Sequence, residues 1–339
     1  METKILKVSG ANYKEEIAAA ANILKQDGVV AIPTETVYGL AASALSDTAI
    51  EKVFKAKGRP QDNPLIVHIS DMEMLDFVAK EIPKSAYVLA EKFWPGPLTM
   101  VLKRNENISE SVSRGLDTVA VRMPSDPIAR QIISVSNLPL AAPSANISGK
   151  PSPTTAAHVI KDLNGKIDAI IDAHDCIVGV ESTVISLVTE KPKLLRPGAV
   201  THEQLSEVLG EVEIAGAVLE ELDSNETASS PGMKYKHYAP SATVYLVEGS
   251  NIEFAEFVNQ KENAVALVFL EDKNIEIPFI VYGSKENEIT LAQNLFKVLR
   301  QIDEKGYKTA YVHAPQKSGV GLAVYNRLIR AAAFKVIKL

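Results

Sequence analysis

Cysteine is almost absent from this sequence, since Cys176 is the single one among 339 residues. An internal disulfide and a zinc site built from several cysteines are therefore both excluded. No run of about 18 apolar residues occurs, so the sequence predicts no membrane-spanning helix. The opening METKILKVSG lacks the apolar core of a signal peptide, and we expect a cytoplasmic protein.

The standard signatures of catalysis and nucleotide binding are also missing. The sequence contains no G-x-x-x-x-G-K-[ST] loop, no G-x-G-x-x-G fingerprint, no G-x-S-x-G elbow and no H-E-x-x-H pair. Its six histidines show no metal-ligand spacing, so we assign no metal to protein side chains. A site without a nucleophile must work by positioning its substrates and neutralising charge.

Basic residues are outnumbered, and the formal net charge is −6. This balance argues against strong nonspecific binding of nucleic acid, which depends on neutralising phosphates. An anion would have to bind where basic side chains gather locally. The rest of the composition, with 46% hydrophobic and 23% charged residues, is typical of a folded protein, and the length favours two domains.

The order of the segments predicts an α/β fold in two units. Strand-like and helix-like segments alternate over residues 1–210. Residues 211–242 form a linker: 211–230 carry six acids and no base, whereas PGMKYKHYAP (231–240) is basic and aromatic. The latter is either a plain linker or a functional segment. Residues 243–339 alternate again and predict a small Rossmann-like domain.

Polar and basic side chains recur in five loops at predicted strand ends, where α/β sheets present ligands. PTETVYGL (33–40) is either a polar turn or a substrate loop. Lys55, Lys57 and Arg59 lie close together at the end of a predicted helix. The helix dipole attracts cations to this end and would account for two basic residues. Three of them indicate a phosphate-binding site as the alternative. The remaining loops are APSANISGKPSPT (142–154), GVESTV (179–184) and LLRPGAV (194–200).

Ser152 and Pro153 have the pattern of a helix start, with a capping residue followed by proline at the first helical position. The free N–H groups of such a start suit an anion. The alternative is a hydrophilic loop with an N-cap.

These motifs together resemble the Sua5/YrdC/YwlC family. The matching stretches are PTETVYGL, KAKGRPQDNPLIVHI, FWPGPLTMVL, GLDTVAVRMP, APSANISGKPSPT, GVESTV, LLRPG and PGMKYKHYAP, which cover residues 28–240 in order. The layout is similar to that of the longer, Sua5-type members. The resemblance implies a twisted open-sheet YrdC-like catalytic domain over 1–210, an active-site-covering segment in 211–242 and a Sua5-type C-terminal domain over 243–339.

The resemblance also implies an activity, that of an L-threonylcarbamoyladenylate synthase, a nucleotidyltransferase. L-Threonine, bicarbonate and ATP with Mg²⁺ would give threonylcarbamoyl-AMP and pyrophosphate. The product would serve N6-threonylcarbamoyladenosine (t6A37) formation in tRNAs that read ANN codons. Partners would be the downstream tRNA threonylcarbamoyl transfer machinery, with at most transient tRNA contact.

Site residues follow from the same resemblance, motif by motif. Four would be catalytic: Lys57, Arg59, Ser144 and Asn146. Threonine would be held by Thr34, His68, Arg122, Ala142 and Ser182. ATP would be held by Lys57, Arg59, Asn63, Thr118, Ser144, Asn146, Ser152, Arg196 and Tyr235, with Tyr235 closing over the triphosphate.

Two departures from the family pattern and three other interpretations remain. Ala41 stands where relatives often have glycine, and Ala173-His174 replace a Gly-Gly pair, which puts the shape of the loop before GVESTV in doubt.

The first alternative function is that of a hydrogenase-maturation carbamoyltransferase, which also forms a carbamoyl adenylate. The zinc fingers of such an enzyme are excluded by the single cysteine. A nucleic-acid-binding module is the second alternative. The third is that 243–339 is a separate regulatory or partner-binding module.

Overall fold

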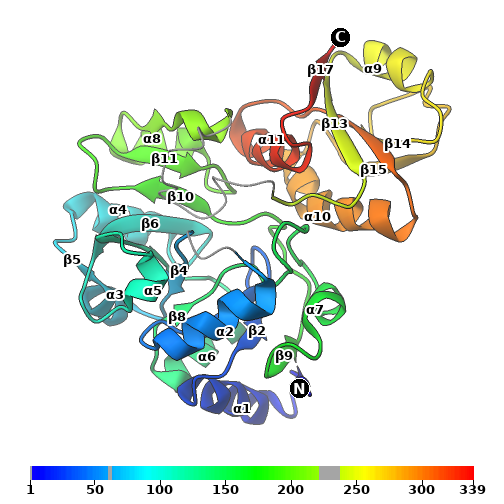
Figure 1. Cartoon of the computed structure of the whole chain (residues 1–339). Coiled ribbons are helices and arrows are strands. Elements are labelled where there is room, and N and C mark those ends of the chain that lie inside the picture. Colours follow the sequence, from blue (N-terminus) through cyan, green and yellow to red (C-terminus); the bar gives the residue numbers. More distant parts are fainter. Residues whose placement is uncertain (1, 60–62, 221–236) are drawn as a thin grey trace.

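The protein is described by a computed structural model covering residues 2–59, 63–220 and 237–339. Within these residues it forms two α/β units, the second lying above and to the right of the first in Figure 1. The predicted fold class, a large twisted sheet followed by a smaller α/β unit, is confirmed. None of the helices described is long and apolar enough to cross a membrane.

The first unit is built on a mixed sheet of twelve described strands. Their order is β1-β9-β2-β3-β8-β4-β7-β6-β10-β11-β12, and β5 pairs with β6. The strands are β1 Lys4–Lys7, β2 Val30–Ile32, β3 Gly39–Ser43, β4 Ile66–His68, β5 Ala79–Lys80, β6 Leu98–Arg104, β7 Thr118–Arg122, β8 Leu140–Ala141, β9 Ala169–Asp172, β10 Thr183–Ser186, β11 Lys193–Arg196 and β12 Glu213–Ile214.

Helices cover both faces of one half of this sheet and one face of the other half. They are α1 Tyr13–Lys25, α2 Asp47–Lys57, α3 Met72–Val78, α4 Lys84–Phe93, α5 Glu110–Ser113, α6 Pro127–Ser136, α7 Ala156–Leu163 and α8 His202–Leu209, with the 3-10 turn η1 at Gly216–Val218. Helices α1 and α6 pack on one face of the β9-β2-β3 region, and α2 and α7 pack on the other.

Local signals explain where these helices begin and end. The side chain of Ser46 accepts a hydrogen bond from the backbone N–H of Ala49 and starts α2. The helix stops at Gly58, which adopts a left-handed conformation with φ 59°. Thr201 followed three residues later by Gln204 has the sequence pattern of a capping box, and the two residues form that reciprocal box at the start of α8.

The second unit is a layered sheet of five parallel described strands, β13 Thr243–Glu248, β14 Val265–Phe269, β15 Phe279–Gly283, β16 Thr309–His313 and β17 Val336–Lys338. Their order is β15-β14-β16-β13-β17. Numbered within the unit this order is 3-2-4-1-5, so the fourth strand lies between the first and the second. In the dinucleotide-binding fold, whose order is 3-2-1-4-5-6, the first and second strands are neighbours. Helix α9 (Asn251–Val258) covers one face. Helices α10 (Glu288–Glu304) and α11 (Gly319–Ala331) cover the other.

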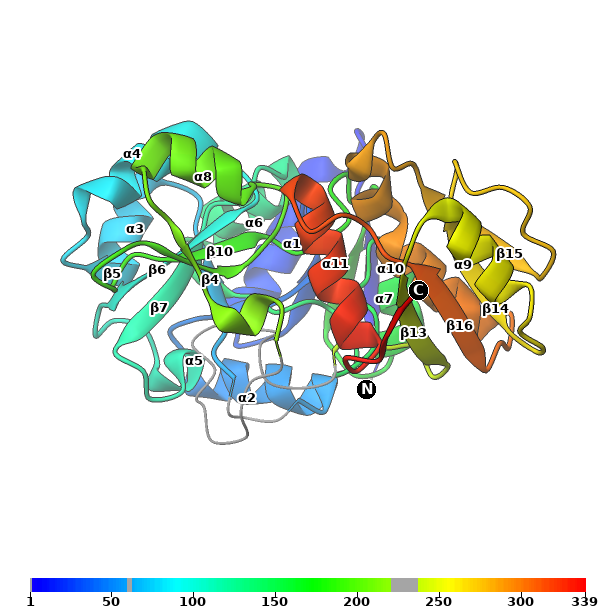
Figure 2. The same cartoon turned by 90° about the horizontal axis from the view of Figure 1, so that it is seen from above.

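Helices α10 and α11 also form the junction with the first unit, as the two perpendicular views show (Figures 1 and 2). Val37 and Val180 of the first unit belong to the same apolar cluster as Leu295 of α10. Gly179 touches α10 so closely that an added Cβ would lie 2.4 Å from the carbonyl oxygen of Ala292. The two units are therefore packed against each other through buried surface.

The predicted linker begins with ordered structure. Strand β12 pairs with β11, so the large sheet continues to Ile214, and η1 follows it. At the other end, Tyr238 and Ala242 are buried in the core of the second unit. Residues 221–236 lie outside the described part, and the predicted domain boundaries stay a prediction.

Candidate active site

One pocket gathers side chains from several strand ends of the first unit. It is bordered by the last residues of the paired parallel strands β4 and β7, His68 and Arg122. Both side chains lie on the sheet face that carries Ile66 and Ala120, because side chains alternate along a strand. That face is covered by a small cluster that includes Val218 of η1 and Leu322 of α11.

Most residues predicted for the site line this pocket. They are Thr34, Lys57, Arg59, His68, Arg122, Ala142, Ser144, Asn146, Ser182 and Arg196. The structure thus brings together residues separated by up to 162 positions in the sequence. Their individual roles remain predictions.

Lys57, the last residue of α2, points away from solvent, while Lys55 on the same helix is exposed. The Lys57 ammonium donates to the backbone carbonyls of Ser144 and Asn146, the latter at 2.7 Å. The Ser144 hydroxyl in turn donates to Oδ1 of Asn146 at 2.6 Å. Burial, together with nearby Arg59, holds the pKa of Lys57 well below its usual value. The helix-dipole explanation therefore fits Lys55 but not Lys57.

Arg122 is also buried, with an exposed fraction of 4%. Its Nη1 donates to Oγ1 of Thr36 at 2.9 Å, and its Nη2 lies 2.7 Å from a carboxylate oxygen of Glu35. Burial alone would raise the pKa of Glu35, but Arg122 reverses this and keeps it below its ordinary value. Thr34 fixes the same loop, since its hydroxyl donates to the carbonyl of Val37 at 2.6 Å.

His68 is neutral in this environment. Burial and the Arg122 guanidinium lower its pKa to about 3. Its Nδ1 has no hydrogen-bond partner among the described residues. A buried ring nitrogen without a partner beside a cation is suited to accept a hydrogen bond from a substrate ammonium or hydroxyl group.

Ser182 and Arg196 are joined directly. Arg196 Nε donates to the Ser182 carbonyl at 3.0 Å, and Nη2 donates to the Ser182 hydroxyl at 3.1 Å. That hydroxyl also shares a 2.7 Å hydrogen bond with Thr99 on β6. Burial lowers the pKa of Arg196 to about 10, so it stays charged at neutral pH.

Ser152 does not start a helix, and that prediction is wrong. Helix α7 begins at Ala156 with Thr155 as its capping residue, because Thr155 and not Ser152 accepts from the backbone N–H of the third residue of the helix. Ser152 is fully buried, and its hydroxyl donates to a carboxylate oxygen of Glu181. It lies just behind the pocket wall and presents no helix N-terminus to it.

Three other predicted residues lie apart from the pocket lining or outside the described residues. Asn63 is buried, and its Oδ1 finds no partner within the described residues. Thr118 is on the same face of β7 as Arg122 but at the opposite end of the strand, partly exposed. Tyr235 lies outside the described residues.

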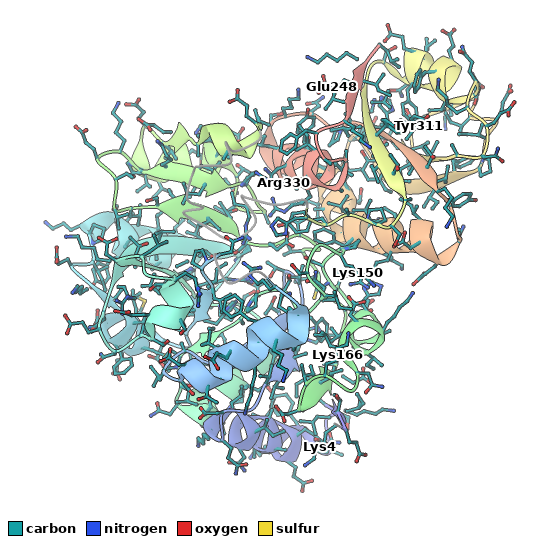
Figure 3. The ribbon with its side chains drawn as sticks, in the orientation of Figure 1. Lys4, Lys150, Lys166, Glu248, Tyr311 and Arg330 are labelled. Atoms are coloured by element: carbon teal, nitrogen blue, oxygen red, sulfur yellow. The ribbon has the colours of Figure 1, made fainter. Side chains whose placement is uncertain are left out.

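Sequence reasoning missed several residues that shape the site. Glu181, His237 and Tyr238 line the pocket, and Glu35 pairs with Arg122. Tyr238 was recognisable as part of the aromatic segment PGMKYKHYAP, but nothing in the sequence separated its role from that of Tyr235. Lys150, which also lines the pocket, and Arg330 of α11 lie on the two sides of the junction between the units (Figure 3).

The structure shows how the loop at Ala173-His174, where relatives often have Gly-Gly, is held in place. The His174 imidazole lies 3.1 Å from a carboxylate oxygen of Asp126, and its carbonyl accepts a 3.1 Å hydrogen bond from the Tyr38 hydroxyl. The loop is thereby fixed to the first turn of α6 through a side chain that glycine lacks. Ala41 is fully buried in β3, opposite Val30 of β2.

Residues 22–198 match the Sua5/YciO/YrdC family model, which carries the description telomere recombination. Residues 200–333 match the C-terminal domain of threonylcarbamoyl-AMP synthase. The threonylcarbamoyl-AMP synthase of Pyrococcus abyssi is 46% identical over 99% of both chains. The enzyme of that name from Bacillus subtilis is 42% identical over 95% of this chain and 94% of its own. The chain belongs to the Sua5 family.

The family assignment extends to the three-dimensional structure. A crystal structure of P. abyssi Sua5 complexed with L-threonine matches with a TM-score of 0.92 and 44% identity, covering 99% of this chain and 100% of that one. Escherichia coli YciO, with a TM-score of 0.52 and 20% identity over 58% of this chain, shares the fold. The Sua5 arrangement of two units therefore spans the whole chain.

The Sua5 pocket offers little to a metal ion. Within the described residues, no cluster of three His, Cys, Asp or Glu side chains has metal-binding geometry. Glu181 is the one carboxylate among the described lining residues, and its two oxygens already bind Ser152 and Arg327. Among the described lining residues, no carboxylate oxygen is therefore left without a protein partner.

Proposed function

We propose that this Sua5-family chain is a threonylcarbamoyl-AMP synthase that joins L-threonine, bicarbonate and ATP in the pocket described above. The observation that carries the proposal is the gathering of basic side chains, Lys57, Arg59, Arg122 and Arg196, around one pocket whose described lining contains a single carboxylate, Glu181. Glu35 already offsets the charge of Arg122, and positive charge gathered along a pocket favours the binding of an anion there. Threonine supplies a carboxylate, and ATP supplies phosphates.

Two groups of lining residues suit the two substrates differently. Arg122 with Thr34 and neutral His68 suits a small amino acid, because a guanidinium binds a carboxylate in a forked geometry. Lys57, Arg59 and Arg196 suit phosphate oxygens. Ser182, proposed for threonine, accepts a hydrogen bond from Arg196, proposed for ATP, and its hydroxyl also shares a hydrogen bond with Thr99.

The chemistry requires no protein nucleophile. The threonine amine combines with bicarbonate to give a carbamate and water. A carbamate oxygen then attacks the α-phosphorus of ATP, and the bond to pyrophosphate breaks. The negative charge that builds on the leaving pyrophosphate is offset by Lys57 and Arg59, which act by position and charge.

Mg²⁺ belongs to the proposal as an ion that enters with ATP, bound by phosphate oxygens and water. Neutralising phosphate charge is the chemistry it would supply. We further propose a cytoplasmic enzyme whose product passes to tRNA threonylcarbamoyl transfer machinery.

Pyrophosphate release by the purified full-length protein tests this function. The assay contains ATP, Mg²⁺ and bicarbonate, with and without L-threonine, and mass spectrometry identifies the adenylate. We expect release to require both threonine and bicarbonate and to be lost in Lys57→Ala. Release that ignores threonine would overturn the substrate assignment, and steeply salt-dependent RNA binding without turnover would favour a binding module.

A further inference from the structure

A side chain of the second unit reaches the wall of the active-site pocket. Arg327, on α11, has no exposed surface and is the largest fully buried side chain described. Its Nε donates to Oε2 of Glu181 at 2.8 Å, and its Nη2 donates to the backbone carbonyl of Glu181 at 3.2 Å. The remaining nitrogen, Nη1, donates to the carbonyl of Pro197 at 2.9 Å.

These bonds connect the two loops that carry Ser182 and Arg196. Glu181 directly precedes Ser182, and Pro197 directly follows Arg196. One guanidinium of the second unit therefore holds both loops of the first. Because the guanidinium fork is planar and rigid, it fixes the separation of its partners more strictly than a lysine could.

The loops are also in close contact with each other. A Cβ on Gly198 would lie 2.4 Å from the backbone nitrogen of Thr183, so the two loops approach each other too closely to admit a side chain at this position. Glu181 extends the connection to Ser152, whose hydroxyl donates to its other carboxylate oxygen. Burial would raise the pKa of Glu181, but Arg327 and Arg196 keep it below its usual value, so the carboxylate is ionised.

We propose that Arg327 is a positioning residue of the active site, through which the C-terminal unit sets the geometry of the Glu181 and Pro197 loops. Those loops in turn place Ser182 against threonine and Arg196 against ATP. The inference rests on the proposed function for the identity of the ligand. It gives the C-terminal unit a part in the reaction besides any partner binding, because a displacement of about 1 Å at a positioning residue can lower a rate 100-fold.

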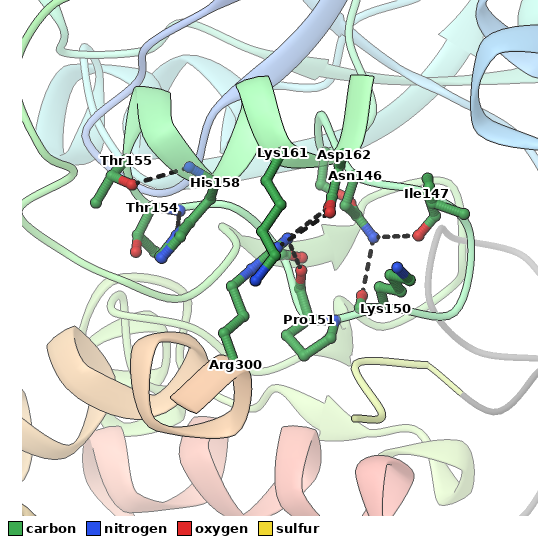
Figure 4. Close-up of polar contacts among 12 residues, drawn as sticks. Asn146, Ile147, Lys150, Pro151, Thr154, Thr155, His158, Lys161, Asp162 and Arg300 are labelled. Carbon is green, nitrogen blue, oxygen red and sulfur yellow. Dashed lines mark hydrogen bonds and ion pairs between the residues drawn. The ribbon is translucent and has the colours of Figure 1, made fainter. Parts of the chain in front are cut away.

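A matched control exists in the same interface. Arg300 of α10 is also buried and spans the junction, binding Asp162 at 2.7 and 3.2 Å and the carbonyl of Pro151 at 2.6 Å (Figure 4). Neither Asp162 nor Pro151 lines the pocket. Arg300→Gln therefore removes a comparable interdomain ion pair without touching the two loops.

The test compares Arg327→Gln, Arg327→Lys, Arg300→Gln and the wild type in kcat/KM for ATP, ATP affinity by calorimetry, and Tm. We expect both glutamine variants to lower Tm, but Arg327→Gln alone to lower kcat/KM for ATP at least 10-fold and weaken ATP binding. Arg327→Lys should retain more kcat/KM than Arg327→Gln, because lysine keeps the positive charge beside Glu181 but lacks the forked guanidinium group. Adding Glu181→Gln to Arg327→Gln should cost far less than the product of the two single effects.

Two outcomes would overturn the inference. One is an Arg327→Gln protein with wild-type kcat/KM and ATP affinity. The other is an equal loss in Arg300→Gln, which would show that docking of the units in general matters rather than this residue. Failure of the proposed function is a separate result, since it would be seen as a wild type that makes no adenylate, while ATP affinity still reports on Arg327.

Discussion

Glu35 and Arg122 form an ion pair of 2.7 Å in which each side chain is 4% exposed. The pair connects the loop after β2 to the end of β7, and Arg122 is one of the pocket residues proposed to bind threonine. A buried pair of this kind is costly to break from one side, because the remaining charge is left without a partner. Glu35 thus compensates a charge that a substrate carboxylate would otherwise be needed to offset.

Replacing Glu35 by glutamine should destabilise the protein by about 3 kcal/mol, the usual loss when one partner of a buried pair is removed. Urea unfolding at pH 7 measures the loss. Glu106→Gln is the control, since Glu106 is largely exposed and its pair with Lys80 is 3.7 Å long; it should leave stability unchanged. Equal stability of the two variants would show that Arg122 needs no counter-charge.

The pair of Glu35 and Arg122 also predicts that the stability of the protein depends on pH. The pKa of Glu35 in the folded protein lies below its ordinary value of 4.5, so its contribution to stability is fully present above pH 4.5. That contribution is lost as the pH falls from 4.5 through the lower, folded-state pKa. The stability difference between wild type and Glu35→Gln should therefore shrink on acidification. Unfolding curves at a series of pH values would contradict this if the difference stayed constant down to pH 3.

Replacing Lys57 should affect turnover strongly and stability little, in contrast to the replacement of Glu35. Lys57→Met removes a buried cation, which relieves a desolvation cost, but leaves the Ser144 and Asn146 carbonyls without their donor. Since these effects oppose each other, we expect stability to change by less than about 2 kcal/mol. Turnover should fall at least about 100-fold, as when one charge-stabilising donor is removed.

Lys55→Met is the matched control for Lys57→Met, because Lys55 is exposed on the same helix. It should retain wild-type turnover and stability. A Lys57→Met protein that turns over normally would exclude Lys57 from the reaction, and equal losses in both variants would point to a general effect on α2.

His68 should remain neutral throughout the physiological range. Burial first, and then Arg122, lower its pKa to about 3, so its imidazole resonances should not move between pH 5 and 8. Two-dimensional NMR of the histidine side chains measures this, with His68→Gln identifying the signal. A titration midpoint near 6.5 would show that the ring is solvated and charged at the pH where threonine binds.

The sequence predicts the layers of this protein well because its signals are local. The capping pattern of Thr201 and Gln204 forms the box that starts α8. Leu291, Leu295, Val298, Leu299 and Ile302, which recur in the sequence at helical spacing, lie buried along α10. The predicted lining residues also converge, because strand ends of one sheet meet at one edge. These features need no knowledge of distant contacts.

The features that the sequence did not predict depend on contacts between residues far apart in the chain. Ser152 has the local pattern of a helix start, but Glu181 lies close enough to bind its hydroxyl, and that contact spans 29 residues. Arg327 shows no signal at all, since an arginine on an amphipathic helix is ordinarily exposed. Its burial depends on the docking of two units, which a linear pattern does not encode.

Gly198 provides the last prediction, because it lies where two loops of the pocket meet. An added Cβ would come within 2.4 Å of the Thr183 nitrogen and 2.7 Å of its hydroxyl, so the loops must separate. Gly198→Ala should therefore destabilise the protein by about 1–3 kcal/mol, as overpacking does, and lower kcat/KM for both ATP and threonine. Gly10→Ala is the control, because nothing lies within 4 Å of the Cβ it adds. Wild-type kinetics in Gly198→Ala would mean that Ser182 and Arg196 tolerate a change in their separation, whereas loss of activity with full stability would show that this separation itself governs turnover.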